Sequence, residues 1–188
     1  MNTKIVLHLL SGGLDSVALL YYLRGQGLFV HCLLFDYGQT HIKELERAKN
    51  QCLRLGVKFT VQKIPHMVGL TDANWVVAHR NSVFLSHAVS KAVEIGADTV
   101  TIGCNADDAA NFPDCRPAFI AAKNAETVAS GYPEIEICAP FIDKSKAYIG
   151  NLAREMGVSF NEIWSCYRGE EEPCGKCPAC EKLKLAML

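Results

Sequence analysis

Short apolar runs alternate with segments of helical periodicity along this chain. The apolar runs have the length and composition of buried strands and lie at Thr3–Leu10, Leu28–Phe35, Val57–Ile64, Ala97–Gly103 and Ile135–Pro140. Amphipathic patterns between them predict helices at Asp15–Arg24, His41–Leu55, Ser82–Ile95, Pro117–Ser130 and Lys144–Met156. Strands that alternate with helices in this way predict an α/β fold, with a doubly wound parallel sheet of five strands covered on both faces.

Composition limits the function classes. The chain has 188 residues, with 19 Lys and Arg against 20 Asp and Glu, so it has no general affinity for polyanions. We expect one packed domain over residues 1–160 and a small C-terminal segment over 161–188. No apolar stretch approaches the ~20 residues of a membrane helix, and the N-terminus lacks the apolar core of a signal peptide. We therefore expect a cytoplasmic protein that does not associate with membranes.

Four of the nine cysteines lie in the C-terminal segment, as Cys166-x7-Cys174-x2-Cys177-x2-Cys180. In a chain without export signals, such a cluster indicates a metal site rather than disulfides. Four thiolates at this spacing match a closed tetrahedral zinc site, whereas catalytic zinc sites keep one position open. Disulfides and an iron–sulfur cluster are the competing interpretations. We expect one structural Zn²⁺ per chain that fixes the C-terminal tail.

The first predicted strand leads directly into Ser11-Gly12-Gly13-Leu14-Asp15-Ser16. A tight strand–helix connection with a capping side chain would explain part of this string. A phosphate site explains more of it, because glycines leave backbone N–H groups accessible and a helix N-terminus favours anions. The position is also suitable, since ligands of doubly wound sheets bind beyond the carboxyl ends of the strands. The spacing matches neither GxxxxGK[ST] nor GxGxxG.

This string resembles the pyrophosphate-binding loop of the ATP pyrophosphatases, the PP-loop superfamily with an adenine nucleotide alpha hydrolase-like fold. These enzymes cleave ATP to AMP and pyrophosphate while they activate a substrate oxygen. The resemblance implies that ATP is a co-substrate with Mg²⁺, that Asp15 either caps the helix or holds the cation, and that serine and glycine donors receive the leaving pyrophosphate. The implied nucleotide-binding residues are Leu10, Ser11, Gly12, Gly13, Leu14, Asp15 and Ser16.

Polar residues also follow the second and fourth predicted strands, at the same edge of the sheet. A connecting turn and a solvated acidic loop are the simple interpretations of these segments. The second segment, GCNADDAANFPDCRPAF, is richer in functional side chains than an acidic loop requires. The polar residues that we expect near a ligand here are Asp36, Tyr37, Gln39, Asp107, Asp108, Asp114 and Arg116.

Five motifs in order resemble one group, the 7-cyano-7-deazaguanine synthase or QueC family. They are Ser-Gly-Gly-x-Asp-Ser, Phe-Asp-Tyr-Gly-Gln, an Arg-Asn pair that opens a helix, Pro-Asp-Cys-Arg and the four-cysteine zinc site. The family forms 7-cyano-7-deazaguanine from 7-carboxy-7-deazaguanine and ammonia, for queuosine biosynthesis, through adenylated carboxylate and amide intermediates. The resemblance implies a C–N ligase that converts two ATP per product to AMP and diphosphate and forms a homodimer.

The resemblance also assigns roles to residues. Asp15, Arg80 and Lys146 would act in catalysis, whereas Lys144 would be a surface lysine. An ordinary helix start is an equally good explanation of the pair Arg80-Asn81. The implied substrate-binding residues are Tyr37, Gln39, Arg80, Asn81, Asp107, Asp114 and Arg116.

Two departures from the family pattern leave an alternative open. His79 stands where the family usually has glycine, and a Cβ disfavours positive φ, so we expect a turn of different shape. The segment Pro65–Trp75 is shorter than in ordinary members, which leaves the pocket more open. The alternative is a QueC-like enzyme of a phage or antiphage system that transfers the adenylated deazaguanine to a protein or nucleic acid acceptor. A nucleotide sensor and a tRNA thiolase are alternatives from other classes.

Overall fold

The computed structural model describes residues 4–39, 42–64 and 77–187, and it contains all five predicted strands. They form one sheet in the order β3-β2-β1-β4-β5, and every neighbouring pair is parallel. The chain builds outward from β1 to β3 and then returns to β4 on the other side of β1. The predicted fold class is therefore confirmed, and the switch point of the sheet lies between β1 and β4. The strands are β1 (Ile5–Leu9), β2 (Phe29–Asp36), β3 (Lys58–Lys63), β4 (Thr99–Thr101) and β5 (Glu136–Cys138).

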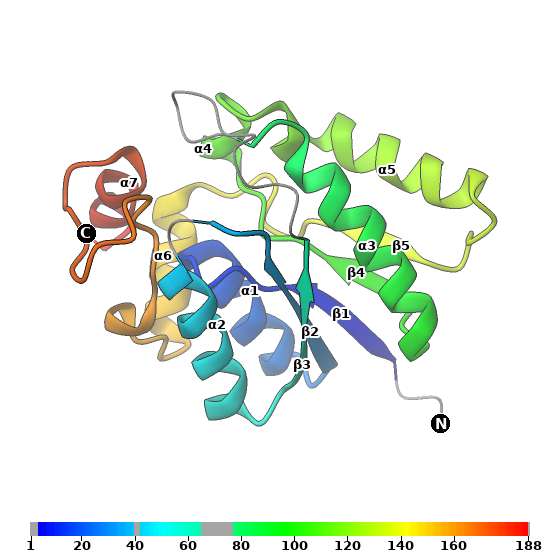
Figure 1. The fold of residues 1–188 in the computed structure, drawn as a ribbon, viewed down its shortest axis with the longest axis horizontal. Helices are drawn as coiled ribbons and strands as arrows, with labels where there is room; N and C mark the ends of the chain where they lie inside the picture. The colour runs from blue at the N-terminus through cyan, green and yellow to red at the C-terminus, as the bar shows by residue number, and fades with distance from the viewer. Residues whose placement is uncertain (1–3, 40–41, 65–76, 188) are drawn as a thin grey trace.

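Helices cover both faces of this sheet (Figure 1). One face carries α1 (Leu14–Gly25), α2 (Ile42–Leu55) and α6 (Lys146–Glu155), and the other carries α3 (Arg80–Ile95) and α5 (Pro117–Ala129). Successive strand residues enter different cores: Val6 packs with the first group of helices and Leu7 with the second. Because both faces of the central strands β1 and β2 are covered, these strands are nearly continuous apolar runs, which the sequence indicates clearly. The edge strand β3 is only partly buried and alternates polar with apolar residues.

Several boundaries differ from the prediction for local reasons. Helix α6 begins two residues later than expected, because Ser145 is its N-cap and accepts a hydrogen bond from the Tyr148 N–H at 3.1 Å. Helix α3 begins two residues earlier, at Arg80. His41, at the predicted start of α2, and the segment Pro65–Trp75 lie outside the described residues. Four short helices lack enough turns for a periodic signal: α4 (Ala106–Ala109), η2 (Pro113–Cys115), η3 (Phe160–Glu162) and α7 (Pro178–Ala186).

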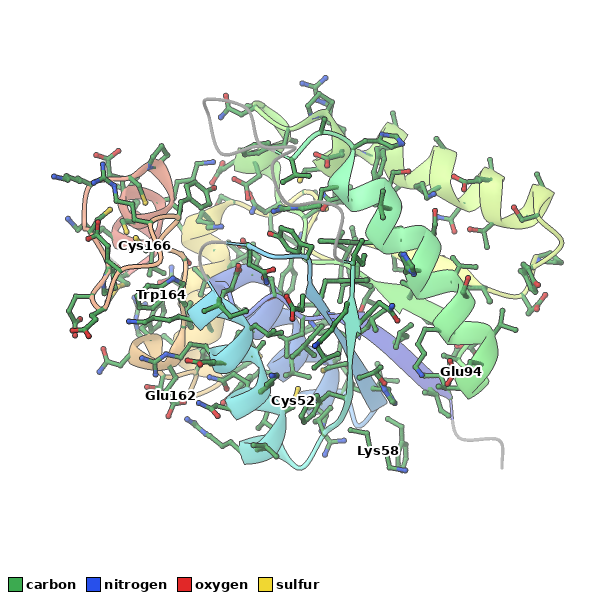
Figure 2. The ribbon with its side chains drawn as sticks, in the orientation of Figure 1. Cys52, Lys58, Glu94, Glu162, Trp164 and Cys166 are labelled. Atoms are coloured by element: carbon green, nitrogen blue, oxygen red, sulfur yellow. The ribbon has the colours of Figure 1, made fainter. Side chains whose placement is uncertain are left out.

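The C-terminal segment packs against both the loop after β1 and helix α6. The N–H of Trp164 donates to the carbonyl of Gly12, in the loop after β1, at 3.1 Å, and its indole Nε1 donates to the Cys166 carbonyl at 2.9 Å. Figure 2 shows Trp164 and Cys166 on the segment that leads into the tail. Helix α7 lies so close to α6 that a Cβ on Gly150 would overlap the carbonyl of Ala186. Among the described residues, no helix is long and apolar enough to cross a membrane.

Candidate active site

The loop after β1 gathers three consecutive backbone amides around two hydroxyls. The N–H groups of Ser11 and Gly12 donate to Ser16 Oγ at 3.2 and 3.3 Å, and the N–H of Gly13 donates to Ser11 Oγ at 3.3 Å. The Ser16 hydroxyl in turn donates to the Gly13 carbonyl at 3.1 Å. Amides that converge in this way at the N-terminus of a helix form a binding place for a phosphate group.

The two glycines of this loop differ in what they require. Gly12 has φ +100°, and a Cβ there would overlap the carbonyl of Glu44 in α2. Only glycine fits this position without displacing α2. Gly13 has φ −78°, and a Cβ there would meet its nearest neighbours, Glu44 Oε1 and Ser11 Oγ, at 3.5 Å. The loop shape therefore depends on Gly12 more than on Gly13.

Leu10 and Leu14 flank the loop and fix its ends. Both side chains are buried in the core beneath α1. The Leu10 N–H donates to the Leu33 carbonyl at 3.0 Å, so it is already used by the neighbouring strand end. The hydroxyl and amide donors for a phosphate therefore come from the serines and glycines of the loop. Leu10 and Leu14 hold the two ends of the loop in the core.

His8 lies under this loop and was not recognised from the sequence. It is fully buried, with Nε2 at 2.8 Å from the carbonyl of Ser16 and Nδ1 at 2.9 Å from Oγ1 of Thr101 in β4. A carbonyl only accepts, so Nε2 carries the proton and Nδ1 accepts from the threonine hydroxyl. Burial lowers the pKa of His8 from 6.5 to about 4, against the effect of both hydrogen bonds. A neutral His8 thus joins β1, β4 and the first turn of α1.

Lys146 is the first residue of α6, and its side chain contacts Asp15, another predicted catalytic residue. Its ammonium forms an ion pair with Asp15 Oδ2, and Asp108 Oδ2 lies 3.7 Å from the same nitrogen. Asp107 instead accepts the backbone N–H of Lys146 at 2.7 Å. Asp108, rather than Asp107, therefore faces the ammonium. Burial opposes the charge on Lys146, but Asp15 and Asp108 outweigh it and raise the pKa of Lys146.

The second oxygen of Asp15 fits a cation. Asp15 Oδ1 is buried and has no hydrogen-bond partner among the described residues. Burial raises the pKa of Asp15, although Lys146 acts in the opposite direction. A buried carboxylate oxygen beside a phosphate-binding loop suits a hard divalent cation such as Mg²⁺, and Asp15 would be the residue that holds it. The residues present thus fit the cation that ATP brings.

Arg80 and Tyr37 form the opposite side of the site. Arg80 donates from NH1 to the Tyr37 hydroxyl at 3.0 Å, and its guanidinium lies over the rings of Tyr37 and Phe84, 5.7 and 5.8 Å from their centres. Gln39 holds the turn below, because its Oε1 accepts from the Tyr37 N–H at 2.9 Å. Asn81 is half-buried in the first turn of α3. Arg80 and Tyr37 can meet an aromatic or anionic ligand, whereas Gln39 shapes the turn.

The loop after β4 carries the remaining predicted substrate residues. Arg116 donates from Nε to the carbonyl of Ala109 at 2.8 Å and therefore braces the loop. Asp114 lies half-buried in η2, and its charge contributes to the raised pKa of Arg80, which burial alone would lower. The structure thus places Asp114 on the Arg80 side of the site and Asp107 on the Lys146 side.

Tyr167 and Glu44 are two more site residues that the sequence reasoning missed. Burial raises the pKa of Tyr167, and the charges of Asp108, Arg80, Lys146 and Glu44 all act on its hydroxyl. Charges from both the Lys146 side and the Arg80 side therefore act on Tyr167. Glu44 stands in the first turn of α2 beside the phosphate loop. No sequence motif marks either residue. Tyr167 simply follows Cys166 of the metal cluster, and Glu44 belongs to an ordinary amphipathic helix.

The four C-terminal cysteines form a compact cluster. Their sulfur atoms all lie within 4.8 Å of one another, close to the ~3.8 Å that a tetrahedral site with Zn–S bonds of ~2.3 Å requires. The Cys174 N–H donates to Cys166 Sγ at 3.4 Å, and hydrogen bonds, first that from the Lys176 backbone, lower the pKa of Cys174 to about 6. The cluster can therefore hold a metal ion, and Cys166, Cys174, Cys177 and Cys180 are its ligand set.

Comparisons with known proteins show which family the chain belongs to. The family model described as queuosine biosynthesis protein QueC matches residues 5–75 and 71–187. The 7-cyano-7-deazaguanine synthase of Psychromonas ingrahamii is 36% identical over 201 residues, which cover 96% of this chain and 90% of that protein. The synthase of Caldicellulosiruptor saccharolyticus is also 36% identical, over 91% of this chain and 85% of its own length.

This chain belongs to the QueC family. Solved structures support the fold that QueC implies. The U34-tRNA thiolase NcsA of Methanococcus maripaludis aligns with a TM-score of 0.63 at 16% identity, over 98% of this chain and 63% of NcsA. The NH3-dependent NAD synthetase of Campylobacter jejuni aligns with a TM-score of 0.55 at 20% identity, over 86% of this chain and 67% of its own. At these identities the likeness concerns the fold alone.

The structure shows the backbone conformation of His79, which replaces the usual glycine of the QueC pattern. His79 precedes α3 with φ 60° and ψ 18°, in the left-handed conformation that glycine adopts most easily. The histidine therefore keeps a glycine-like backbone, and our expectation of a different turn shape was wrong. The other departure, the shortened segment Pro65–Trp75, lies outside the described residues.

Proposed function

We propose that this chain is a 7-cyano-7-deazaguanine synthase. In this function it joins 7-carboxy-7-deazaguanine with ammonia and releases AMP and diphosphate from ATP. The observation that carries the proposal is the Asp15–Lys146 ion pair beside three converging loop amides, in a chain 36% identical to enzymes of that name. Small molecules are the partners that this reaction needs.

The first half of the reaction activates the carboxylate. A carboxylate oxygen of the substrate attacks the α-phosphorus of ATP, and the bond from that phosphorus to the leaving pyrophosphate breaks. The amides of Ser11, Gly12 and Gly13, which the hydroxyls of Ser11 and Ser16 hold together at the start of α1, exchange these hydrogen bonds for the oxygens of the leaving pyrophosphate and stabilise its charge. Lys146 turns its protonated ammonium from Asp15 toward the phosphates. Mg²⁺, when bound at Asp15, supplies charge neutralisation at the phosphate oxygens.

Ammonia then attacks the carbon of the acyl adenylate and expels AMP, and loss of a proton gives the amide. In the second half, the amide oxygen attacks another ATP and pyrophosphate leaves again. Loss of the nitrogen protons and departure of AMP leave the nitrile. Two ATP are consumed per nitrile. Both halves use the same loop and the same lysine, since each transfers an oxygen to the α-phosphorus and expels pyrophosphate.

The Arg80 side of the site is suited to the deazaguanine. The buried rings of Tyr37 and Phe84 support Arg80 from below, and its guanidinium keeps a permanent positive charge over both. We assign to Arg80 the substrate carboxylate, and to Asp114 the N–H edge of the guanine-like ring, since a carboxylate accepts from such an edge. Asn81 and Tyr37 would complete this pocket, with Gln39, Asp107 and Arg116 as supports of its loops.

The proposal includes a structural Zn²⁺ on the four cysteines, because four thiolates without an open position match zinc in its structural role. We place the boundary between the catalytic domain and this zinc segment near residue 160. The free thiols of the chain suit the reducing cytoplasm. The homodimer that the resemblance implies is measurable by light scattering at micromolar concentration.

Turnover resolved by mass spectrometry tests this function. The protein is incubated with Mg-ATP, ammonium and 7-carboxy-7-deazaguanine, and both AMP and the deazaguanine products are quantified. Free nitrile with two AMP per molecule supports the proposal. Amide or a macromolecular conjugate without free nitrile would favour the phage or antiphage alternative. Absence of both AMP and product would contradict the assigned substrate.

A further inference from the structure

A lysine of the C-terminal tail reaches into the ATP site. Lys182 lies in α7 and donates from Nζ to Asp108 Oδ1 at 2.6 Å. The other oxygen of the same carboxylate lies 3.7 Å from Lys146 Nζ. The charges therefore alternate in one row, Asp15–Lys146–Asp108–Lys182, from the phosphate loop to the tail. These side chains are 15%, 16%, 19% and 30% exposed, so solvent screens the row only in part.

The tail places Lys182 at this point by several contacts. Helix α7 begins at Pro178, between the metal-site residues Cys177 and Cys180, and its far end packs on Gly150 of α6. The Lys182 ammonium also lies over the ring of Phe112, 5.7 Å from its centre. Its position is thus fixed from both ends of α7 and by the loop after β4.

The other lysines of the tail do not share this arrangement. Lys184 donates to the Gly175 carbonyl at 2.8 Å, within the tail itself. Lys176 stands between two metal-site cysteines with an exposed side chain. Lys182 is therefore distinguished by its position, and not by the general basicity of the segment.

We propose that Lys182 is a positioning residue of the ATP site, which offsets the charge of Asp108 so that Lys146 and the phosphate loop can accept the polyphosphate. Without Lys182, the Lys146 ammonium would be the only cation of the row and would face the charges of both Asp15 and Asp108. The Asp108 charge would then hold Lys146 away from the phosphates and would repel them directly. The inference rests on the ATP site of the proposed function, but not on the identity of the deazaguanine substrate.

Binding of an ATP analogue that is not cleaved tests this role without catalysis. We would measure the dissociation constant of Mg²⁺–α,β-methylene-ATP by calorimetry for wild type, Lys182→Met, Lys182→Arg and the control Lys176→Met. Metal content per chain and melting temperature are recorded for each. We expect Lys182→Met to bind about tenfold more weakly, Lys182→Arg to restore most of the affinity, and Lys176→Met to match wild type. Affinity of Lys182→Met within twofold of wild type would overturn the proposal.

A double variant separates charge from structural damage. If the loss in Lys182→Met comes from the bare Asp108 charge, adding Asp108→Asn removes the repulsion, and the double variant binds the analogue more tightly than Lys182→Met. If Lys182→Met only disturbs the tail, the second change gives no recovery, and the proposal fails. Failure of the synthase function would appear in the turnover products and would leave these binding constants unaffected.

Discussion

Lys146 and Asp15 are 131 residues apart in the sequence, and their side chains form an ion pair at the carboxyl edge of the sheet. The pair lies at the switch point between β1 and β4, where α1 and α6 both begin. It keeps a protonated ammonium beside the phosphate loop and leaves Asp15 Oδ1 available to a cation. The proposed catalysis depends on this relationship.

Replacement of Lys146 tests the pair. We expect Lys146→Met to lower kcat/KM for ATP by about a hundredfold or more, because the charge that faces the leaving pyrophosphate is lost. The matched control is Lys144→Met, since Lys144 is exposed and pairs with its neighbour Asp143. Steady-state release of AMP measures both variants. Equal losses in the two variants would contradict the role assigned to Lys146.

The two loop glycines should respond differently to alanine. Gly12→Ala introduces a Cβ at φ +100° that overlaps the Glu44 carbonyl, so we expect the free energy of unfolding to fall by about 2 kcal/mol or more. Gly13→Ala has ordinary contacts and normal φ, so we expect a change below about 1 kcal/mol. Urea denaturation followed by circular dichroism measures both. A similar loss in both variants would show that the loop does not hold Gly12 as described.

The buried His8 predicts a pH dependence of stability. Its pKa in the folded protein is about 4 against 6.5 for an unperturbed histidine, so the unfolded state takes up the proton first as the pH falls. Stability from this residue is complete above pH 6.5 and is lost as the pH falls from there to about 4. Between pH 7.5 and 5.0, wild type should lose about 2 kcal/mol more than His8→Gln. Urea titrations of both proteins at the two pH values measure this difference. Parallel losses would show that His8 is not buried and neutral.

His79 should carry backbone strain. Histidine at φ 60° costs about 1–2 kcal/mol relative to a right-handed residue, whereas glycine adopts this conformation freely. After the entropy that glycine loses on folding, His79→Gly should raise the free energy of unfolding by about 0.5–1 kcal/mol. His79→Ala keeps the Cβ and should bring no such gain. Thermal unfolding of the three proteins decides this, and an equal gain with alanine would mean that the imidazole, and not the backbone, is the cause.

The parts of the site that could be predicted from the sequence are those written in one continuous segment. The phosphate loop follows a buried strand directly, and the four cysteines lie within a short stretch, so local spacing indicates both. The central strands β1 and β2 were evident because they are largely buried, whereas the edge strand β3 is only partly buried and is marked by its alternating apolar residues. Lys146 was identified only by family resemblance, since its neighbour in space, Asp15, is distant in the chain.

The rest depended on three-dimensional contacts that no local pattern records. Asp108 turns toward Lys146 because Asn105 caps α4: the Asn105 side chain accepts from the Asp108 N–H at 2.9 Å and donates to its carboxylate at 2.6 Å. The adjacent residues Asp107 and Asp108 therefore have different roles: Asp107 accepts the backbone N–H of Lys146, and Asp108 faces its ammonium. Their spacing in the sequence does not distinguish the two. Lys182 enters the site only after the tail folds back on α6. His8 is a single polar residue within an apolar strand, and its partner Thr101 lies in another strand.

Transfer of oxygen from substrate to AMP tests the central claim most directly. 7-Carboxy-7-deazaguanine with ¹⁸O at both carboxylate positions is turned over with Mg-ATP and ammonium in unlabelled water, and AMP is analysed by mass spectrometry. We expect two AMP per nitrile, each with one ¹⁸O, because the carboxylate and then the amide oxygen attack the α-phosphorus. AMP without ¹⁸O, or cleavage of ATP to ADP, would contradict that claim.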